Sequence, residues 1–345
     1  MSDKTITFLS SRGRGINADL MLMHDFLSNS EECEEYSYRF FSKSERTQNP
    51  MANAGALKAR KSFSVNATDI VCIDNSLTGK TEEEEGIRIL LSLPYEYQFK
   101  NYLTVKEKNK DCNYKTFQSF THIIPGSPFS EELLKSAYEL EYQKILPGVA
   151  HPLAWDVCQN DSCEKARKKL EFYFPDIKDK KVLSLMMSGD EKEQEKFFRD
   201  FSLDELMEHL GPDWLVLTTS TGMRDCSFSF SGEKNSFGYI NLIASPSLLV
   251  YVADVLITNE ARFATAYAGK GKPVYCPKVK KNFFEKFMDT YYSDLVLKKA
   301  TQMLELDFQS AQLTKTQDEF CEQFWYPEAR EPYSLVKKLF TREAN

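Results

Sequence analysis

The sequence predicts a two-domain α/β protein with parallel, doubly wound sheet architecture. The first observation behind this fold class is length, because 345 residues exceed the size at which one hydrophobic core usually stops growing. The second is that short apolar runs alternate with helix-like stretches, which predicts parallel strands joined by right-handed crossovers. The third is that the longest apolar runs, such as residues 248–257 with Asp254 inside, are interrupted and strand-sized.

We expect the first domain to span residues 1–145. Apolar, β-rich runs predict strands at residues 5–10, 36–42, 69–74, 88–93 and 120–124. Helical periodicity predicts helices at residues 17–27 and 129–140, and residues 58–65 form a basic helix or loop. The chain therefore begins with a strand, a turn containing two glycines, and a helix.

We expect the second domain at residues 146–322. Its predicted strands are residues 145–149, 182–187, 214–218, 239–242, 255–257 and, as the last strand, 274–276. Its predicted helices are residues 203–210, 248–252 and 263–268. The remaining segment, residues 323–345, carries one more helix-like stretch at residues 333–340.

Composition excludes several classes of protein. The net charge of −7 and the pI near 5.4 give no overall electrostatic case for a nucleic-acid partner. No apolar run reaches the roughly 18 residues of a transmembrane helix, and the N-terminal apolar run is too short for a secretory signal. Eight cysteines are scattered, and only Cys158 and Cys163 lie close together, which favours reduced thiols over a metal site. We therefore expect a cytoplasmic protein.

Four blocks of sequence carry a resemblance to a known family. They are residues 127–138, residues 145–152, residues 180–185 with 203–217, and residues 248–258 with 271–275. Together they resemble the CDP-glycerol glycerophosphotransferase family of teichoic-acid and related polymer synthesis, whose members have the two-domain GT-B glycosyltransferase fold. The resemblance implies an α/β protein of two Rossmann-like, doubly wound domains that face each other across a cleft. The resemblance implies that the helix in residues 323–345 returns to the first domain, and that the second domain binds a nucleotide-activated donor.

The resemblance also implies the partners of such an enzyme. The donor would be CDP-, CMP- or UDP-linked, and the acceptor a glycan or polymer, with no tightly bound cofactor and no metal. A membrane-linked acceptor would make the protein peripheral to the inner membrane face. Two departures concern the family's histidines, because residues 91–96 replace a Trp-His-Gly block and residues 218–222 replace a His-Pro pair.

The candidate donor-binding residues follow two predicted strands, at the edge where parallel sheets bind ligands. After the strand at residues 214–218, hydroxyls and a glycine suit phosphate oxygens, and this group is Thr218, Thr219, Ser220, Thr221 and Gly222. An ordinary surface turn is the alternative.

The second donor group follows the strand at residues 255–257, where the family has an Asp, an aromatic residue and two serines. Here the chain has Asn259, Glu260, Ala261 and Arg262. Glu260 would accept hydrogen bonds from ribose or sugar hydroxyls, and Arg262 would offset phosphate charge. The alternative is that Asn259 caps the next helix and that Glu260 and Arg262 face solvent.

Three further candidates lie in the first domain or near the domain junction. The glycine turn could hold an anionic acceptor or phosphate through Arg12, Gly13, Arg14 and Gly15, or be a plain strand-to-helix turn. Glu96, between two tyrosines, is a candidate general base, with an amphipathic packing loop as the alternative. His151 is a candidate acid or base, with a structural histidine as the alternative.

The function predicted from these residues is transfer of a sugar or polyol phosphate from a nucleotide-activated donor to a cell-surface polymer or glycan. A different class of function stays open, in which the chain is a catalytically silent GT-B-fold binding or scaffolding subunit of a glycan-synthesis complex. A third interpretation is a GT-B sugar transferase or epimerase of another family, for which Glu260 is the hint.

Overall fold

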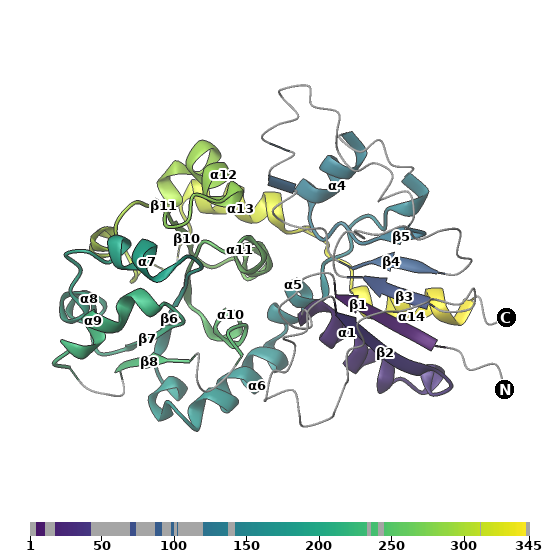
Figure 1. Cartoon of the computed structure of the whole chain (residues 1–345), viewed down its shortest axis with the longest axis horizontal. Helices are drawn as coiled ribbons and strands as arrows, with labels where there is room; N and C mark the ends of the chain where they lie inside the picture. Colours follow the sequence, from purple (N-terminus) through teal and green to yellow (C-terminus); the bar gives the residue numbers. More distant parts are fainter. Residues whose placement is uncertain are drawn as a thin grey trace. The chain divides into compact units, whose positions relative to one another are not determined.

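The computed structural model describes residues 5–10, 18–42, 70–73, 87–91, 98–99, 102, 120–136, 142–232, 236–240, 245–310 and 312–342. It divides into two compact units (Figure 1). The first unit is Met1–Trp155 with Trp325–Asn345, and the second is Asp156–Phe324. Among the described residues, no helix is both long enough and apolar enough to cross a membrane.

The first unit contains a five-stranded parallel sheet in the order β2-β1-β3-β4-β5. Its strands are β1 (Thr5–Ser10), β2 (Ser37–Ser42), β3 (Ile70–Ile73), β4 (Arg88–Leu90) and β5 (His122–Ile123). All five predicted strands of this unit are confirmed. β1 has the predicted bounds, β2 begins one residue later than predicted, and β4 and β5 are shorter. The strand order reverses between β1 and β3, and such a reversal is where open α/β sheets bind ligands.

Helices from the two ends of the chain share the core of this unit. They are α1 (Ala18–Ser28) and α14 (Pro332–Arg342), and Figure 1 draws both beside the strands of this sheet. Phe340 is fully buried in the same cluster as Ile6 and Leu20. The Tyr36 hydroxyl donates to the Phe340 carbonyl oxygen at 3.3 Å. The last helix therefore completes the core of the first unit.

The segment at residues 145–149, predicted as a strand, forms only isolated bridges, so this prediction is wrong. Ile145 pairs with Ile123, and Val149 pairs with Arg330. Between them, Pro147 has no N–H to donate and Gly148 has a φ of +72°, so a continuous ladder cannot form. The following helix α5 (Pro152–Val157) spans the division between the units. The unit also contains α4 (Pro128–Ser136) and the 3-10 helices η1 (Glu31–Cys33) and η3 (Tyr142–Lys144).

The second unit contains a six-stranded parallel sheet in the order β11-β10-β9-β6-β7-β8. Its strands are β6 (Lys181–Met186), β7 (Trp214–Thr218), β8 (Phe237–Tyr239), β9 (Val255–Thr258), β10 (Val274–Pro277) and β11 (Val296–Leu297). The prediction that the strand at residues 274–276 is the last one is wrong, because the two residues of β11 follow β10 and pair with it. Two residues are too few to show any periodicity in the sequence.

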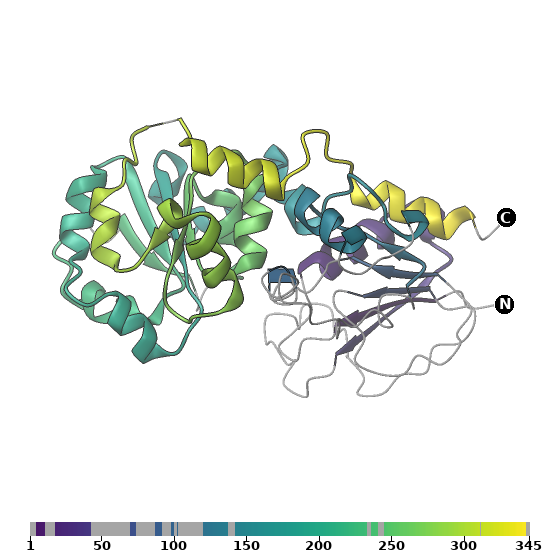
Figure 2. The same cartoon turned by 90° about the horizontal axis from the view of Figure 1, so that it is seen from above.

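Helices cover both faces of this sheet (Figure 2). They are α6 (Asn160–Glu171), α7 (Glu191–Phe197), α8 (Leu203–Leu210), α9 (Arg224–Phe228), α10 (Leu248–Val252), α11 (Ala261–Ala268), α12 (Phe283–Tyr291) and α13 (Lys315–Phe324). Short 3-10 helices are η4 (Pro175–Lys178), η5 (Thr221–Met223), η7 (Ser293–Leu295) and η8 (Ala300–Glu305). The strands β7, β9 and β10 are buried along their whole length, as in sheets covered on both sides. Predicted helices 203–210 and 248–252 are confirmed with the same bounds.

The buried C-terminal helix gives a stability prediction. Replacing Phe340 by Ala should destabilise the first unit by about 3–5 kcal/mol, because a fully buried ring is removed from a packed core. Urea unfolding followed by circular dichroism measures the loss. Lys338→Ala, at an exposed position of the same helix, is the matched control and should change stability by less than about 0.5 kcal/mol. Equal effects of the two substitutions would contradict this account of α14.

Candidate functional site

The candidate site lies at the carboxyl ends of the central strands of the second unit. Strand order runs one way from β6 through β7 to β8, and the other way from β6 through β9 and β10 to β11. The reversal therefore falls between β6 and β9, and a crevice outside these two strand ends is the expected ligand position in a doubly wound sheet. The loops that form this edge are residues 187–190 after β6, 259–260 after β9 and 278–282 after β10.

Asn259 joins the loops on the two sides of this reversal. It is fully buried, and its side-chain oxygen accepts hydrogen bonds from the Ser188 N–H at 2.8 Å and the Ser188 hydroxyl at 3.2 Å. Its side-chain nitrogen donates to the Ser188 carbonyl oxygen at 2.8 Å and to Glu285 Oε1 at 2.8 Å. These bonds use both polar atoms of the amide, so Asn259 fixes the floor of the site.

Glu285 is the second half of this network and is 1% exposed. Besides Asn259, its carboxylate accepts from the N–H groups of Lys280 at 2.8 Å and Lys281 at 2.6 Å. Lys281 has a φ of +56°, a left-handed conformation that costs a non-glycine residue energy and needs support from its surroundings. The buried carboxylate supplies that support, and Asn282 adds a bond from its side-chain nitrogen to the Asn259 carbonyl oxygen at 3.1 Å.

The lysine side chains of this loop are exposed. Lys280 and Lys281 lie at exposed positions, and no ion pair is recorded for either among the described residues, whereas neighbouring Lys278 is paired with Asp289 at 2.6 Å. The backbone is thus held rigidly by Glu285 while two ammonium groups stay available to solvent. A fixed loop with two positive charges beside strand ends is suited to binding phosphate oxygens.

A separate buried amide, Gln194 on α7, organises the loop after β7. Its side-chain oxygen accepts from the Ser220 hydroxyl at 2.6 Å, from Thr221 at 3.4 Å and from the Gly222 N–H at 3.2 Å. Its side-chain nitrogen donates to the Gly189 carbonyl oxygen at 3.2 Å. A Cβ on Gly222 would lie 2.5 Å from the Gln194 Cβ and 2.7 Å from its carbonyl carbon, so glycine is required there.

These contacts place the predicted group at residues 218–222. Thr218 and Ser220 are fully buried, so the alternative of an ordinary surface turn is wrong for them. The Thr218 hydroxyl donates to the Leu185 carbonyl oxygen at 3.1 Å, and it accepts from the Ser220 N–H at 2.9 Å. In this arrangement the hydroxyls of Thr218 and Ser220 bond to the protein itself. Phosphate binding by Thr219 and Thr221, which are partly exposed, stays a prediction.

The predicted group after β9 lies at the start of α11. The helix N-cap is Glu260, whose side chain makes no capping bond, so capping by Asn259 is ruled out as the alternative. The Glu260 N–H donates to the Thr258 hydroxyl at 3.1 Å, and the carboxylate is partly exposed at the carboxyl end of β9. The Arg262 guanidinium lies over the Phe263 ring at 4.5 Å and is partly buried. Ligand contacts by these two side chains stay predictions.

His151 belongs to the first unit and is 3% exposed. Its ring fills the space beside Gly126, where an added Cβ would lie 2.1 Å from Nε2, and Gly126 has a φ of +79°. Burial lowers the pKa of His151 to about 4, although hydrogen bonds with the backbone at Ile124 and Pro125 act in the opposite direction. The imidazole is therefore neutral at pH 7 and packed against backbone.

Two sets of predicted residues lie outside the described part of the chain. They are the acceptor group Arg12, Gly13, Arg14 and Gly15, and the candidate base Glu96. The acceptor group follows β1, whose carboxyl end is at the reversal of strand order in the first sheet. Both sets remain predictions from the sequence.

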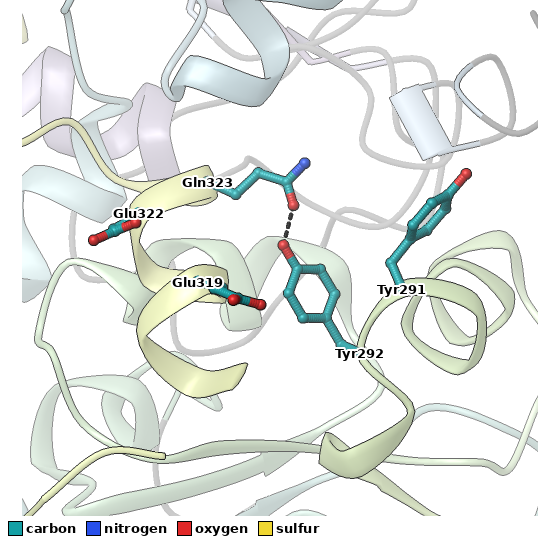
Figure 3. A pocket seen from close by; sticks show the side chains of 5 residues that line it. All are labelled: Tyr291, Tyr292, Glu319, Glu322 and Gln323. Atoms are coloured by element: carbon teal, nitrogen blue, oxygen red, sulfur yellow. Dashed lines mark hydrogen bonds between the residues drawn. The ribbon is translucent and has the colours of Figure 1, made fainter. Parts of the chain in front are cut away.

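A hollow of about 480 Å³ lies elsewhere on the second unit and contains none of the predicted residues (Figure 3). Its lining side chains come from the end of α12 and from α13: Tyr291, Tyr292, Glu319, Glu322 and Gln323. The Tyr292 hydroxyl donates to the Gln323 side-chain oxygen. Two carboxylates in the lining disfavour a phosphate-bearing ligand, so this hollow is a poorer phosphate site than the lysine loop after β10.

Several residues of the site were not found from the sequence. They are Ser188, Gln194, Lys280, Lys281 and Glu285. One signal was present, because Ser188, Gly189 and Asp190 follow an apolar run, and Asp190 and Glu193 form a capping box that starts α7. No comparable signal marks Glu285 or Gln194, whose importance arises from loops that are distant in sequence. Among the described residues, no group of three or more His, Cys, Asp or Glu side chains could hold a metal ion.

Glu285 gives a test of the loop network. Glu285→Gln should lower the free energy of unfolding of the second unit by about 1–3 kcal/mol. The two carboxylate oxygens of Glu285 each accept a backbone N–H bond, and in glutamine an NH₂ group, which cannot accept, takes the place of one of these oxygens. Chemical denaturation measures the effect. Glu208→Gln on the exposed face of α8 removes the same charge without breaking a described bond, and should leave stability within about 0.5 kcal/mol.

His151 gives a pH prediction. The folded-state pKa lies below the ordinary value of 6.5, so the unfolded chain binds more protons below pH 6.5, and stability falls as pH drops towards 4. From about pH 7 to about pH 5 this histidine should cost about 2 kcal/mol of stability. Urea unfolding at both pH values, on the wild type and on His151→Gln, isolates the contribution. An equally steep loss in the variant would refute the assignment.

Comparison with known proteins bears on the fold. No family model matches the chain, and no curated protein matches its sequence. Solved structures do match in fold. The H548A variant of the wall teichoic acid polymerase TagF is 15% identical with a TM-score of 0.69, and the match covers 99% of this chain and 89% of that one. The unsubstituted TagF structure is 16% identical with a TM-score of 0.64, covering 98% and 88% of the two chains.

A second kind of protein shares the fold. The UDP-GlcNAc 2-epimerase of Methanocaldococcus jannaschii is 10% identical with a TM-score of 0.54, and the match covers 97% of this chain and 99% of that one. A wall teichoic acid polymerase is thus among the structural neighbours, in agreement with the resemblance of the sequence blocks to a family of teichoic-acid and related polymer synthesis. Since the teichoic acid polymerase and the epimerase both match over nearly the full length of this chain, the chain has the two-domain GT-B fold, built from two Rossmann-like units.

Proposed function

We propose that this protein is a transferase that moves a sugar or polyol phosphate from a nucleotide-activated donor to a cell-surface polymer or glycan. The donor is CDP-, CMP- or UDP-linked, and its phosphates bind at the carboxyl ends of β6, β9 and β10. One observation carries the proposal: the loop after β10 is fixed by the buried Glu285 carboxylate and exposes Lys280 and Lys281 at the edge where a doubly wound sheet binds ligands.

The chemistry of such a transfer explains why these groups suit it. The bond that breaks leaves a nucleotide with negative charge on its phosphate oxygens, and fixed positive charges stabilise that charge as it develops. Lys280 and Lys281 supply ammonium groups without a metal ion. Glu260, at the end of the neighbouring strand β9, would accept hydrogen bonds from a pair of ribose or donor hydroxyls.

The acceptor side of the proposal rests on the sequence. Arg12 and Arg14 in the first glycine turn would bind an anionic acceptor, and Glu96 would take the proton from its attacking hydroxyl. His151 is packed against Gly126 and 3% exposed, so the proposal gives the general-base role to Glu96 alone. A membrane-linked acceptor would bring the protein to the inner membrane face as a peripheral protein.

A catalytically silent subunit is the second candidate, and one observation favours it. The Asn259 amide, which stands where the family continues with phosphate-contacting residues, bonds instead to the protein itself. The Thr218 and Ser220 hydroxyls, in the segment that replaces the family's His-Pro pair, do the same. Such a protein would bind the nucleotide donor and present it, or sense it, without transfer. Binding without turnover on any acceptor distinguishes this candidate from the transferase.

Titration calorimetry with CDP-, UDP-, GDP- and CMP-linked donors tests the proposal, together with product analysis on polymer and glycan acceptors. We expect at least one donor to bind, and Lys280→Ala with Lys281→Ala to weaken that binding by about tenfold or more, since each tenfold step is about 1.4 kcal/mol. Binding should also weaken as salt is raised.

Lys315→Ala is the matched control, because its side chain is 91% exposed on α13 and its one ion pair within the described part of the chain is with Glu319. It should leave donor affinity unchanged. Failure of every donor to bind would refute the site, and the same loss of affinity in the control and the double variant would show that only overall charge matters.

A further inference from the structure

A cluster of two thiols and one amine lies on the second unit, away from the strand-end site. Cys163 is on α6 and Lys270 follows α11, 107 positions later in the sequence. The Lys270 amine contacts Cys163 Sγ at 3.5 Å and donates to the Tyr251 carbonyl oxygen at 2.5 Å. Cys158, the other member of the close cysteine pair in the sequence, is near enough that the charges of Lys270 and Cys163 affect its pKa.

We propose that Cys163 and Lys270 are a peroxide-responsive modification site, in which oxidation joins the cysteine sulfur to the lysine nitrogen by a reversible sulfur–nitrogen bond. Three features of the cluster support this: the direct contact of the two reacting atoms, the access of Cys163 to solvent, and the anchoring of the lysine amine. The inference is independent of the proposed transferase function.

The step balances with hydrogen peroxide as the oxidant. Peroxide oxidises the Cys163 thiol to a sulfenic acid and is reduced to one water molecule. The lone pair of the Lys270 nitrogen then attacks the sulfur, the sulfur–oxygen bond breaks, and the oxygen leaves as a second water with a proton from the amine. The protein loses two hydrogens in total, and a thiol reductant reverses the bond. Backbone nitrogens react with sulfenic acids in the same way.

The position of Lys270 provides the nucleophile that this step needs. An ammonium group has no free lone pair, so only the neutral amine reacts. Burial lowers the pKa of Lys270, and the neighbouring Lys272 lowers it further, although Cys163 and Asp254 act in the opposite direction. The bond to the Tyr251 carbonyl oxygen holds the amine next to Cys163, so the reacting atoms are aligned before oxidation.

Cys158 is a poor competitor for the oxidised sulfur. A disulfide between Cys158 and Cys163 would require a thiolate at Cys158. Burial raises the pKa of Cys158 to about 12, so this thiolate is scarce at neutral pH. Cys163 is partly exposed, which leaves its sulfur open to peroxide, and its thiol donates to the Val157 carbonyl oxygen at 3.2 Å. The oxidised sulfur therefore reacts with the amine that already touches it.

The sulfur–nitrogen bond would link α6 covalently to the turn after α11. A covalent link between distant positions reduces the freedom of the unfolded chain. We therefore expect the peroxide-treated protein to unfold at a higher urea concentration than the reduced protein, and dithiothreitol to restore the original midpoint.

Mass spectrometry of the full chain tests the proposal directly. The wild type is treated with hydrogen peroxide, digested without reductant and searched for linked peptides. The expected product joins the peptides of Cys163 and Lys270, weighs two hydrogens less than their sum, and disappears after dithiothreitol. A Cys158–Cys163 disulfide, or Cys163 oxidised further with Lys270 unmodified, would overturn the proposal.

Three variants sharpen the result. Lys270→Met removes the amine but keeps a long apolar stem, so the link should vanish and trapping of the Cys163 sulfenic acid by dimedone should rise several-fold. Lys165→Met, at an exposed position of α6 two residues from Cys163, is the matched control, and Cys158→Ser removes the competing thiol; both should keep the link. Loss of the link in Cys158→Ser would assign the chemistry to the cysteine pair and contradict the proposal. The wild-type and Cys158→Ser digests decide the question even if Lys270→Met folds poorly.

Discussion

The hydrogen-bonded pair of Asn259 and Glu285 is the interaction on which the candidate site depends. Both side chains are almost fully buried, and together they join the loops that follow β6, β9 and β10. Burying a carboxylate is costly unless several donors satisfy it, and Glu285 accepts from the Asn259 amide and two backbone N–H groups. These buried bonds therefore fix the three loops relative to one another, because any shift of one loop would leave a buried polar group without its partner.

This constraint determines which groups face outward. The Glu285 carboxylate binds the N–H of Lys281 and supports its left-handed backbone, in a loop whose Lys280 and Lys281 side chains are exposed. On the other side of β6, the Gln194 amide turns the Ser220 hydroxyl inward. Positive charge is therefore concentrated after β10, whereas the hydroxyl-rich loop after β7 mainly supports the structure. A phosphate-bearing ligand would find its strongest electrostatic partner at the lysine loop.

The fold could be predicted from the sequence where an element carries its own pattern. The strand β7 and the helix α8 have the predicted bounds, because a run of buried apolar residues and a helical stripe are local signals. The strand predicted at residues 145–149 does not form, because this apolar segment contains Pro147 and Gly148, which prevent a continuous ladder of hydrogen bonds. The two-residue strand β11 carries no pattern and exists only through its pairing with β10.

For the candidate site, the sequence by itself indicated the strand ends, and the tertiary structure decided which polar groups there bond to the protein. Polar residues directly after a buried strand must lie at its carboxyl end, so Asn259 and Glu260 were located correctly from local order alone. Whether such a residue binds a ligand or the protein depends on partners that are far away in the chain. Asn259 meets Ser188, 71 positions earlier, and Glu285, 26 positions later. Only folding brings these groups together, and for that reason the sequence could indicate the edge but not the lysine loop that the buried carboxylate holds there.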